Sequence, residues 1–404
     1  MDTFDGMKLH ASIGGANHGR GQPATARGQV PAAPAGLQDT DLQTPVLTGN
    51  QVRHHRQLLP ATISRLFAQP PATVNVTSRE EVSSALGASL YMPALRPDLA
   101  SRIADLGARV GVTSVVICLE DSIPDELLDD AEENLVRQVQ LVEWSELPIL
   151  VFLRPRSAGQ LADLIERLGP GLSGITGFVL PKFTADKGEE WLDVIEHARD
   201  INPLLFAMPI LEGPEVLYVA DRTRELALLG EMFERRGELI ASIRIGATDL
   251  SGLLGIRRSR SSSVYDIPSI AAVIGDILNV WGRPRSRHVV TGAVWEYYRQ
   301  TAGSADLGLV REIERDIECG MLGKSVIHPS HVRVVNALLT VTWSDWTDAF
   351  SILSGPGGVS ASAQNDRMNE SKPHANWAAR VLRRSHVFGV LREGVEPLEL
   401  TRVV

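Results

Sequence analysis

The chain has 404 residues, and 44% of them are hydrophobic, which is enough for a large core. Its formal net charge of −9 argues against generic binding to nucleic acid, because a protein that follows a phosphate backbone carries a basic excess. No apolar run reaches the length of a transmembrane helix, and no secretory signal is evident. We therefore expect no nucleic-acid or membrane partner, and a cytoplasmic protein whose cysteines, Cys118 and Cys319, stay reduced.

The two ends of the chain differ in composition from the middle. Residues 1–50 are rich in Gly, Ala, Pro, Thr and Gln, which predicts a disordered tail. Residues 51–87 follow as an N-terminal helical extension. Residues 351–404 are too few for a separate globular domain, so we interpret them as an arm that packs on the central domain or on a neighbouring subunit. Within this arm the pattern predicts a hairpin over 359–369 and a helix over 374–389.

Residues 88–350 alternate short apolar runs with amphipathic segments of helical period. The apolar runs are 89–94, 114–119, 149–153, 178–180, 205–211, 243–247, 289–294 and 325–327. The helical segments are 97–107, 125–141, 158–168, 187–198, 216–237, 267–281, 307–319 and 329–339. Buried parallel strands have this apolar character, and eight strand–helix units in one stretch predict an α/β fold, the (β/α)8 TIM barrel.

Two acidic residues, Glu212 and Asp249, follow the fifth and sixth predicted strands. In a TIM barrel the C-terminal strand ends form the active site, so these carboxylates are expected to lie close together. Mg²⁺ accepts one or two protein carboxylates and leaves positions for water and substrate oxygens, and Mn²⁺ is also possible. Such a metal ion stabilises an enolate as it forms. The alternative is two solvated loop acids, or an ion pair with a nearby arginine.

Three basic residues follow other predicted strands and are candidates for binding an acidic substrate. Arg96 and Arg154 are each able to hold a carboxylate through two parallel hydrogen bonds or to support a developing oxyanion. A structural salt bridge is the alternative for both. Lys182 is a candidate Schiff-base lysine, but beside a metal pair we favour an electrostatic or structural role.

The remaining candidates are an acidic pair and a histidine. Glu120 and Asp121 are adjacent and point in different directions, so we expect them to orient an arginine or a metal-bound water rather than to bind one ion together. His328 follows the eighth predicted strand, where it either binds substrate or serves as a structural hydrogen-bonding group.

Taken in order, seven segments of the chain resemble the HpcH/HpaI aldolase and citrate lyase β-subunit-like family. These segments are 89–97, 117–121, 152–154, 180–182, 209–213, 246–258 and 323–330. The resemblance implies an Mg²⁺-dependent barrel that makes or breaks carbon–carbon bonds beside a carboxylate or thioester. It implies Glu212 and Asp249 as metal ligands, and Arg96 and Arg154 as the residues that bind substrate and stabilise the enolate. It also implies a homo-oligomer, a trimer or hexamer, in which the arm covers a neighbouring active site.

Three features depart from that family pattern. Cys118 stands where the family usually has an aspartate, and the interval between Glu212 and Asp249 is longer than is common. Residues 364–368 lie where relatives place a catalytic aspartate, for which Asp366 is the nearest substitute. These departures put coenzyme A thioester chemistry in question. They favour a divergent branch of TIM-barrel carbon–carbon bond lyases that is linked to tellurite-resistance gene clusters.

The leading hypothesis is therefore an Mg²⁺-dependent carbon–carbon lyase that acts on a small carbonyl-containing acid or acyl thioester. Glu120, Asp121, Arg96 and Arg154 are its expected catalytic residues, and Lys182 and His328 are expected to assist in binding the substrate. One alternative is a transferase of the phosphoenolpyruvate-binding type. The other is a non-catalytic barrel that binds a small molecule or assembles with other subunits.

Overall fold

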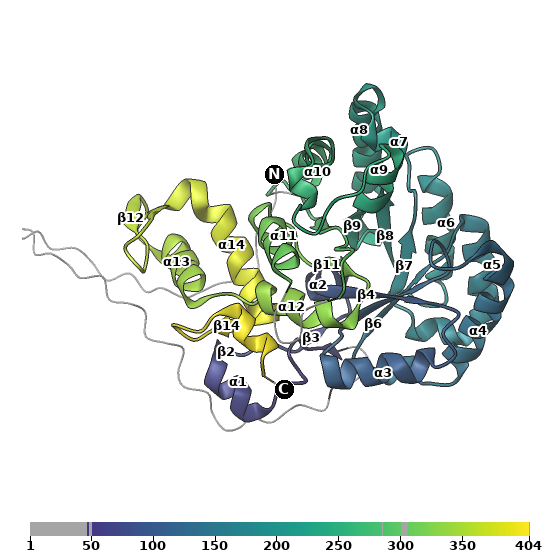
Figure 1. Ribbon diagram of the computed structural model, residues 1–404, viewed down its shortest axis with the longest axis horizontal. Coiled ribbons are helices and arrows are strands. Elements are labelled where there is room, and N and C mark those ends of the chain that lie inside the picture. Colours follow the sequence, from purple (N-terminus) through teal and green to yellow (C-terminus); the bar gives the residue numbers. More distant parts are fainter. Residues whose placement is uncertain (1–46, 48–50, 285, 300–305, 404) are drawn as a thin grey trace, which may run out of the picture. The chain divides into compact units, whose positions relative to one another are not determined.

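The computed structural model describes Leu47 and residues 51–284, 286–299 and 306–403. Eight parallel strands form one sheet in the order β10-β9-β8-β7-β6-β5-β4-β11 (Figure 1). They are β4 (Ala88–Pro93), β5 (Ser114–Cys118), β6 (Leu150–Arg154), β7 (Gly177–Leu180), β8 (Phe206–Leu211), β9 (Ser242–Ile245), β10 (Val289–Thr291) and β11 (Lys324–Val326). Every residue of β5 and β6 is buried, as expected for parallel strands covered on both faces.

The first and last strands of the barrel pair with each other, and a short seam between β10 and β11 closes the sheet. Lys324 to Val326 pair with Ala88 to Leu90 in parallel register. At the seam a bridge joins Gly292 to Lys324. The Gly292 amide donates to the Gly323 carbonyl at 3.0 Å, and the Ser325 amide donates to the Gly292 carbonyl at 3.1 Å. The fold is therefore the predicted (β/α)8 TIM barrel.

Helices lie around this sheet (Figure 1). They are α3 (Leu99–Val110), α4 (Leu128–Gln140), α5 (Ala158–Leu168), α6 (Gly188–Ala198), α7 (Pro214–Leu217), α8 (Val219–Arg235), α9 (Ala247–Leu253), α10 (Pro268–Trp281), α11 (Leu307–Glu318) and α12 (Pro329–Leu339). The segment 216–237, interpreted as a long helix with a small insertion, is divided near its start, because the extended backbone of Tyr218 separates α7 from α8. The short α9 was not predicted, and it carries Asp249 in its first turn.

Segments from both ends of the chain pack together beside the barrel. The N-terminal elements are β1 (Gln51–Val52), α1 (Pro60–Leu66), β2 (Phe67–Gln69), β3 (Val74–Asn75) and α2 (Arg79–Ala85). The later elements are α13 (Trp343–Ser354), β12 (Val359–Ala361), β13 (Met368–Glu370), α14 (Ser371–Phe388) and β14 (Val390–Leu391). β14 pairs antiparallel with β2. β12 pairs antiparallel with β13, and this pairing confirms the predicted hairpin. The tail predicted over 1–50 lies, apart from Leu47, outside the described residues.

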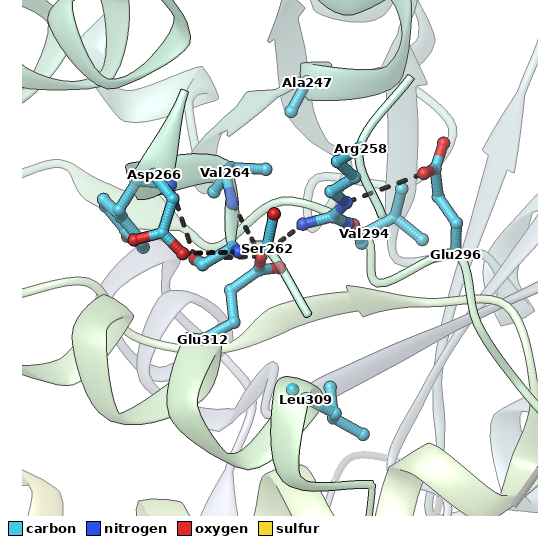
Figure 2. A network of polar contacts seen from close by, with 12 residues as sticks. Ala247, Arg258, Ser262, Val264, Asp266, Val294, Glu296, Leu309 and Glu312 are labelled. Atoms are coloured by element: carbon cyan, nitrogen blue, oxygen red, sulfur yellow. Dashed lines mark hydrogen bonds and ion pairs between the residues drawn. The ribbon is translucent and has the colours of Figure 1, made fainter. Parts of the chain in front are cut away.

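A buried polar network lies against the closing seam. Glu312 of α11 has no exposed surface and accepts hydrogen bonds from the Val264 amide at 3.0 Å and from Lys324 Nζ at 3.1 Å. Lys324 Nζ also lies 2.7 Å from an oxygen of Asp316. Arg258 lies between Glu312 and Glu296 and forms ion pairs with both (Figure 2). These contacts join the loop after α9 to α11 and to the first residue of β11.

No helix in the described part of the chain is long and apolar enough to cross a membrane. Cys118 is buried in β5, Cys319 is exposed after α11, and both thiols are free.

Candidate active site

Six charged side chains come together where the barrel strands end. Their positions at the C-terminal ends of neighbouring strands are those of a TIM-barrel active site. We call this set the mouth cluster: Glu120 and Asp121 after β5, Arg154 at the end of β6, Lys182 after β7, Glu212 after β8, and Asp249 in the first turn of α9.

Arg154 is the central cation of the mouth cluster. Its Nη2 atom lies 2.8 Å from Glu120 Oε2, 3.1 Å from Asp121 Oδ2 and 3.6 Å from Glu212 Oε1. The residue is only 7% exposed. Burial works against its charge, but the acidic groups of Tyr91, Cys118, Glu120 and Glu212 together raise the pKa of Arg154. The guanidinium therefore stays charged, as a stabiliser of negative charge must.

Lys182 connects two carboxylates of the mouth cluster. Its backbone amide donates to Glu212 Oε1 at 2.8 Å, and its Nζ atom forms an ion pair with Glu120. Burial opposes the charge, but the hydrogen bond and the negative charge of Glu120 raise the pKa of Lys182. A protonated amine is not a nucleophile, so the arrangement supports an electrostatic role over a Schiff base.

Glu212 and Asp249 are held in a setting that penalises their ionisation. Glu212 is 3% exposed, and burial followed by the charge of Asp249 raises its pKa to about 8, against the opposing effect of Arg154. Burial and the charge of Asp121 raise the pKa of Asp249, while Arg154, Lys182 and a hydrogen bond with Glu212 act in the other direction. A buried and a half-buried carboxyl group whose charges repel each other are stabilised by a cation placed between them.

The donor set fits Mg²⁺. This ion needs one or two carboxylates and keeps several water molecules, which two neighbouring acids can satisfy. Within the described ranges no group of three or more His, Cys, Asp or Glu side chains is arranged to hold a metal ion. Further coordination positions would therefore belong to water and substrate oxygens.

Gly246 gives Glu212 the space that it occupies. A Cβ atom at position 246 would overlap the Cβ, Cδ and Oε2 atoms of Glu212. Gly246 also donates its amide to the Leu211 carbonyl at 3.2 Å, which fixes the turn between β9 and α9 against β8. The glycine therefore determines where the carboxylate lies relative to Asp249.

The other predicted site residues lie apart from the mouth cluster. Arg96 is 42% exposed, and its Nε atom lies 2.7 Å from Asp98 Oδ1. His328 accepts a hydrogen bond from the Ser330 amide at 3.2 Å, which caps α12, and its ring stacks on Tyr298. In the part of the chain that the structure describes, neither side chain contacts the cluster, so their roles in substrate binding stay predictions.

Asp366 is engaged within the hairpin of the arm. Its Oδ1 atom accepts a hydrogen bond from Ser362 Oγ at 2.7 Å, and its amide donates back to the same hydroxyl at 3.2 Å. These bonds tie the carboxylate to the turn between β12 and β13. No contact between Asp366 and the mouth cluster occurs in the described residues of this chain.

Two cavities lie near charged residues. One of about 740 Å³ is lined by Arg65, Glu318, Arg384 and other residues of the helix ends and C-terminal segment, away from the mouth cluster. The other, of about 270 Å³, includes Thr248 of α9 and Glu296 in its wall. No residue of the mouth cluster lines either of these two cavities; the smaller one shares the helix α9 with Asp249.

A family of carbon–carbon bond lyases of the TIM-barrel fold matches residues 80–390, which include the complete mouth cluster. The chain belongs to this family. The match agrees with the predicted class of enzyme. A search of curated proteins finds no match to this lyase.

Solved structures similar to this chain include proteins in complex with magnesium. The protein CitE from Mycobacterium tuberculosis, in complex with magnesium, acetoacetate and coenzyme A, is 20% identical, with a TM-score of 0.51 over 75% of this chain and 99% of CitE. RipC from Yersinia pestis is 16% identical, with a TM-score of 0.46 over 65% of this chain and 99% of RipC. Malate synthase from Haloferax volcanii, in complex with magnesium and glyoxylate, is 16% identical, with a TM-score of 0.47 over 62% of this chain and 74% of the malate synthase chain. At 20% identity the likeness to CitE shows the fold.

Sequence reasoning missed two residues beside the cluster of this lyase, Tyr91 of β4 and Arg244 of β9. The Arg154 guanidinium lies over the Tyr91 ring at 6.0 Å, and the Arg244 guanidinium lies over the same ring at 5.7 Å. The available signal was an arginine between two isoleucines in the buried strand Ser242–Ile245.

Proposed function

We propose that the protein is an Mg²⁺-dependent carbon–carbon bond lyase that acts on a small carbonyl-containing acid through an enolate, with Mn²⁺ as a possible replacement. The observation that carries this proposal is the mouth cluster, in which the paired carboxyls of Glu212 and Asp249 adjoin the buried Arg154. Retro-aldol or retro-Claisen cleavage and the reverse condensation can all proceed through an enolate that a metal ion and a cation stabilise in this way.

Glu212 and Asp249 would hold the metal ion, which when bound polarises the substrate carbonyl. Arg154 would direct its guanidinium toward the substrate carboxylate or the developing enolate oxygen, since it stays charged and faces Glu212. Glu120 and Lys182 would keep Arg154 in place, because Glu120 forms ion pairs with both cations. This assigns Glu120 to positioning rather than to direct contact with the substrate.

Asp121 occupies the more open side of the acidic pair. Its side chain is 51% exposed and contacts Arg154 at 3.1 Å. Burial acts against ionisation, but its hydrogen bond with Glu120 and the charges of Arg154 and Lys182 lower the pKa of Asp121. Asp121 would therefore stay ionised at the entrance and hold Arg154 from the solvent side.

We further propose that the chain forms a homo-oligomer, a trimer or hexamer, through its arm. Exposed apolar side chains on the arm support this proposal, because Val359, Met368 and Trp377 lie on β12, β13 and α14. We also assign the chain to the branch linked to tellurite-resistance gene clusters, on the basis of Cys118 and the position of Asp366.

Calorimetric titration with Mg²⁺ and Mn²⁺ tests the metal site, with pyruvate or oxaloacetate present or absent. Exchange of the pyruvate methyl protons for solvent deuterium, followed by NMR, tests enolate formation without knowledge of the natural substrate. We expect metal binding and metal-dependent exchange in the wild type, and loss of both in Glu212→Ala and Asp249→Ala. Absence of metal binding in the wild type would reject the lyase proposal and favour a non-catalytic barrel.

A further inference from the structure

Arg244 lies inside the barrel directly below the mouth cluster. It is 1% exposed, and its Cα pairs in register with that of Ile210, two residues before Glu212. Its Nη2 atom donates to Ser325 Oγ at 2.9 Å, and its Nη1 atom lies 3.3 Å from the Met208 sulfur. These partners come from β11 and β8, so the guanidinium reaches across the barrel interior.

The charge of Arg244 has no carboxylate partner among the described residues. Its hydrogen-bond partners are neutral, and its Nε atom is buried without a partner. A buried cation is costly unless an anion compensates it. Other buried arginines in the described ranges do have acidic partners: Arg79 with Glu80, Arg154 with Glu120, Arg222 with Asp276, and Arg258 with Glu312. Arg244 therefore carries a charge that the described protein leaves uncompensated.

Tyr91 connects this cation to the mouth cluster. Its ring contacts the guanidinium groups of both Arg244 and Arg154, each by a cation–π interaction. Its hydroxyl forms no hydrogen bond with any residue that the structure describes, and the residue is only half-buried. A hydroxyl that is unpaired and reachable beside two cations is a donor for an anionic ligand.

We propose that Arg154, Tyr91 and Arg244 form an anion subsite that receives the carboxylate of the substrate. Arg154 and the Tyr91 hydroxyl contact the carboxylate, and Arg244 acts from below through its charge and by holding the Tyr91 ring. The inference rests on the proposed function and deepens it, because it defines the substrate as an acid whose carboxylate binds deep in the mouth rather than at exposed Arg96.

The charges around the subsite favour a singly charged acid. When all are ionised, the four carboxylates of the mouth cluster face its two cations, and Arg244 adds a third. These groups together carry one net negative charge. A bound divalent metal ion changes this to one net positive charge, which a monocarboxylate neutralises. Because Arg244 repels the metal ion and attracts the acid, its removal should change the two affinities in opposite directions.

Three variants test the subsite by calorimetry, with Mg²⁺ alone and with pyruvate at saturating Mg²⁺. Arg244→Met should weaken pyruvate binding by about tenfold or more and should tighten Mg²⁺ binding measured without pyruvate. Arg244→Lys should retain most of the pyruvate affinity because it keeps the charge. Tyr91→Phe retains the ring, so it should weaken pyruvate binding by about tenfold and leave Mg²⁺ affinity unchanged.

A purely structural role for Arg244 predicts that Arg244→Met weakens both ligands together, which would overturn the proposal. If Arg244→Met does not fold, the test rests on Tyr91→Phe. Wild-type pyruvate affinity in Tyr91→Phe would also overturn the proposal. Arg79→Met, which alters a buried arginine near the start of β9, controls for general destabilisation. Pyruvate binding that depends on Tyr91 and Arg244, without methyl-proton exchange, would support the subsite while rejecting the lyase. Normal exchange with unaltered pyruvate affinity in both variants would reject the subsite alone.

Discussion

Gly246 packs against the side chain of Glu212 with no room for a methyl group between them. Gly246 has φ −90° and ψ 68°, the inverse γ-turn region that alanine also adopts, so Gly246→Ala should act through the clash of its Cβ with the Cβ and Oε2 atoms of Glu212, which displaces the carboxylate and the turn beside it. We expect Mg²⁺ affinity to fall about 10- to 100-fold, the range seen when support for a ligand is lost. Calorimetry measures the effect. Gly252→Ala, in the helix that follows, is the matched control, since a Cβ there meets nothing within 4 Å. A Gly246→Ala variant that binds Mg²⁺ as tightly as Gly252→Ala would contradict the argument.

The raised pKa of Glu212 predicts how metal binding depends on pH. Burial, followed by the charge of Asp249, raises this pKa to about 8, and a metal ligand must be ionised. Below about pH 8 binding must therefore release a proton, so Mg²⁺ affinity should rise about tenfold per pH unit and level off above that value. Titrations in buffers of different ionisation enthalpy count the released protons. An affinity that is flat across this range would show that Glu212 is already ionised in the free protein.

Arg154→Ala should remove the charge that stabilises the enolate. Loss of one such group costs about 3 kcal/mol of barrier, so methyl-proton exchange should slow by about 100-fold. Mg²⁺ binding should persist, because the Arg154 guanidinium has two opposing effects on it. Its charge repels the metal ion, and the same charge stabilises the ionised form of Glu212, which binds the ion. Arg167→Ala removes an arginine from a surface ion pair with Glu132 and should leave exchange unchanged. Exchange at the wild-type rate in Arg154→Ala would exclude its assigned role.

Lys324→Met should destabilise the barrel without touching the mouth cluster. It leaves Glu312 and Asp316 buried without the cation that lies 3.1 Å and 2.7 Å from them. Removing one partner of a buried ion pair costs about 3–5 kcal/mol, which denaturant unfolding measures. The exposed ion pair of Arg235 and Glu189 provides the comparison, since Arg235→Ala should cost less than about 1 kcal/mol. Equal losses in the two variants would mean that the buried network contributes no more than a surface pair.

The fold was predictable because apolar runs of buried parallel strands are easy to distinguish from amphipathic helices. Strand positions agree within a few residues, as for 114–119 against Ser114–Cys118. The short helix α9 and the helix α13 were missed, since α9 begins directly at a strand end and α13 is rich in polar and aromatic residues. Local pattern does not separate such helices from loops.

The candidate site was predictable to the extent that strand ends converge. Arg154, Lys182 and Glu212 do meet, because the topology of a closed parallel sheet brings consecutive strand ends together. Arg96 lies elsewhere because a nearby aspartate offers an ion pair within its own loop. Arg244 was missed because its importance lies in the lack of a partner, and this depends on which side chains from other strands surround it.

The seam between β10 and β11 gives the barrel a weak side. Among the described residues, one bridge joins these strands, whereas β4 and β5 share five paired residues. In hydrogen exchange we expect the amides of Gly292 and Ser325 to lose protection through local opening well before those of β5. The barrel would then open locally between β10 and β11, while the strands that carry Arg154 and Glu212 stay paired in register.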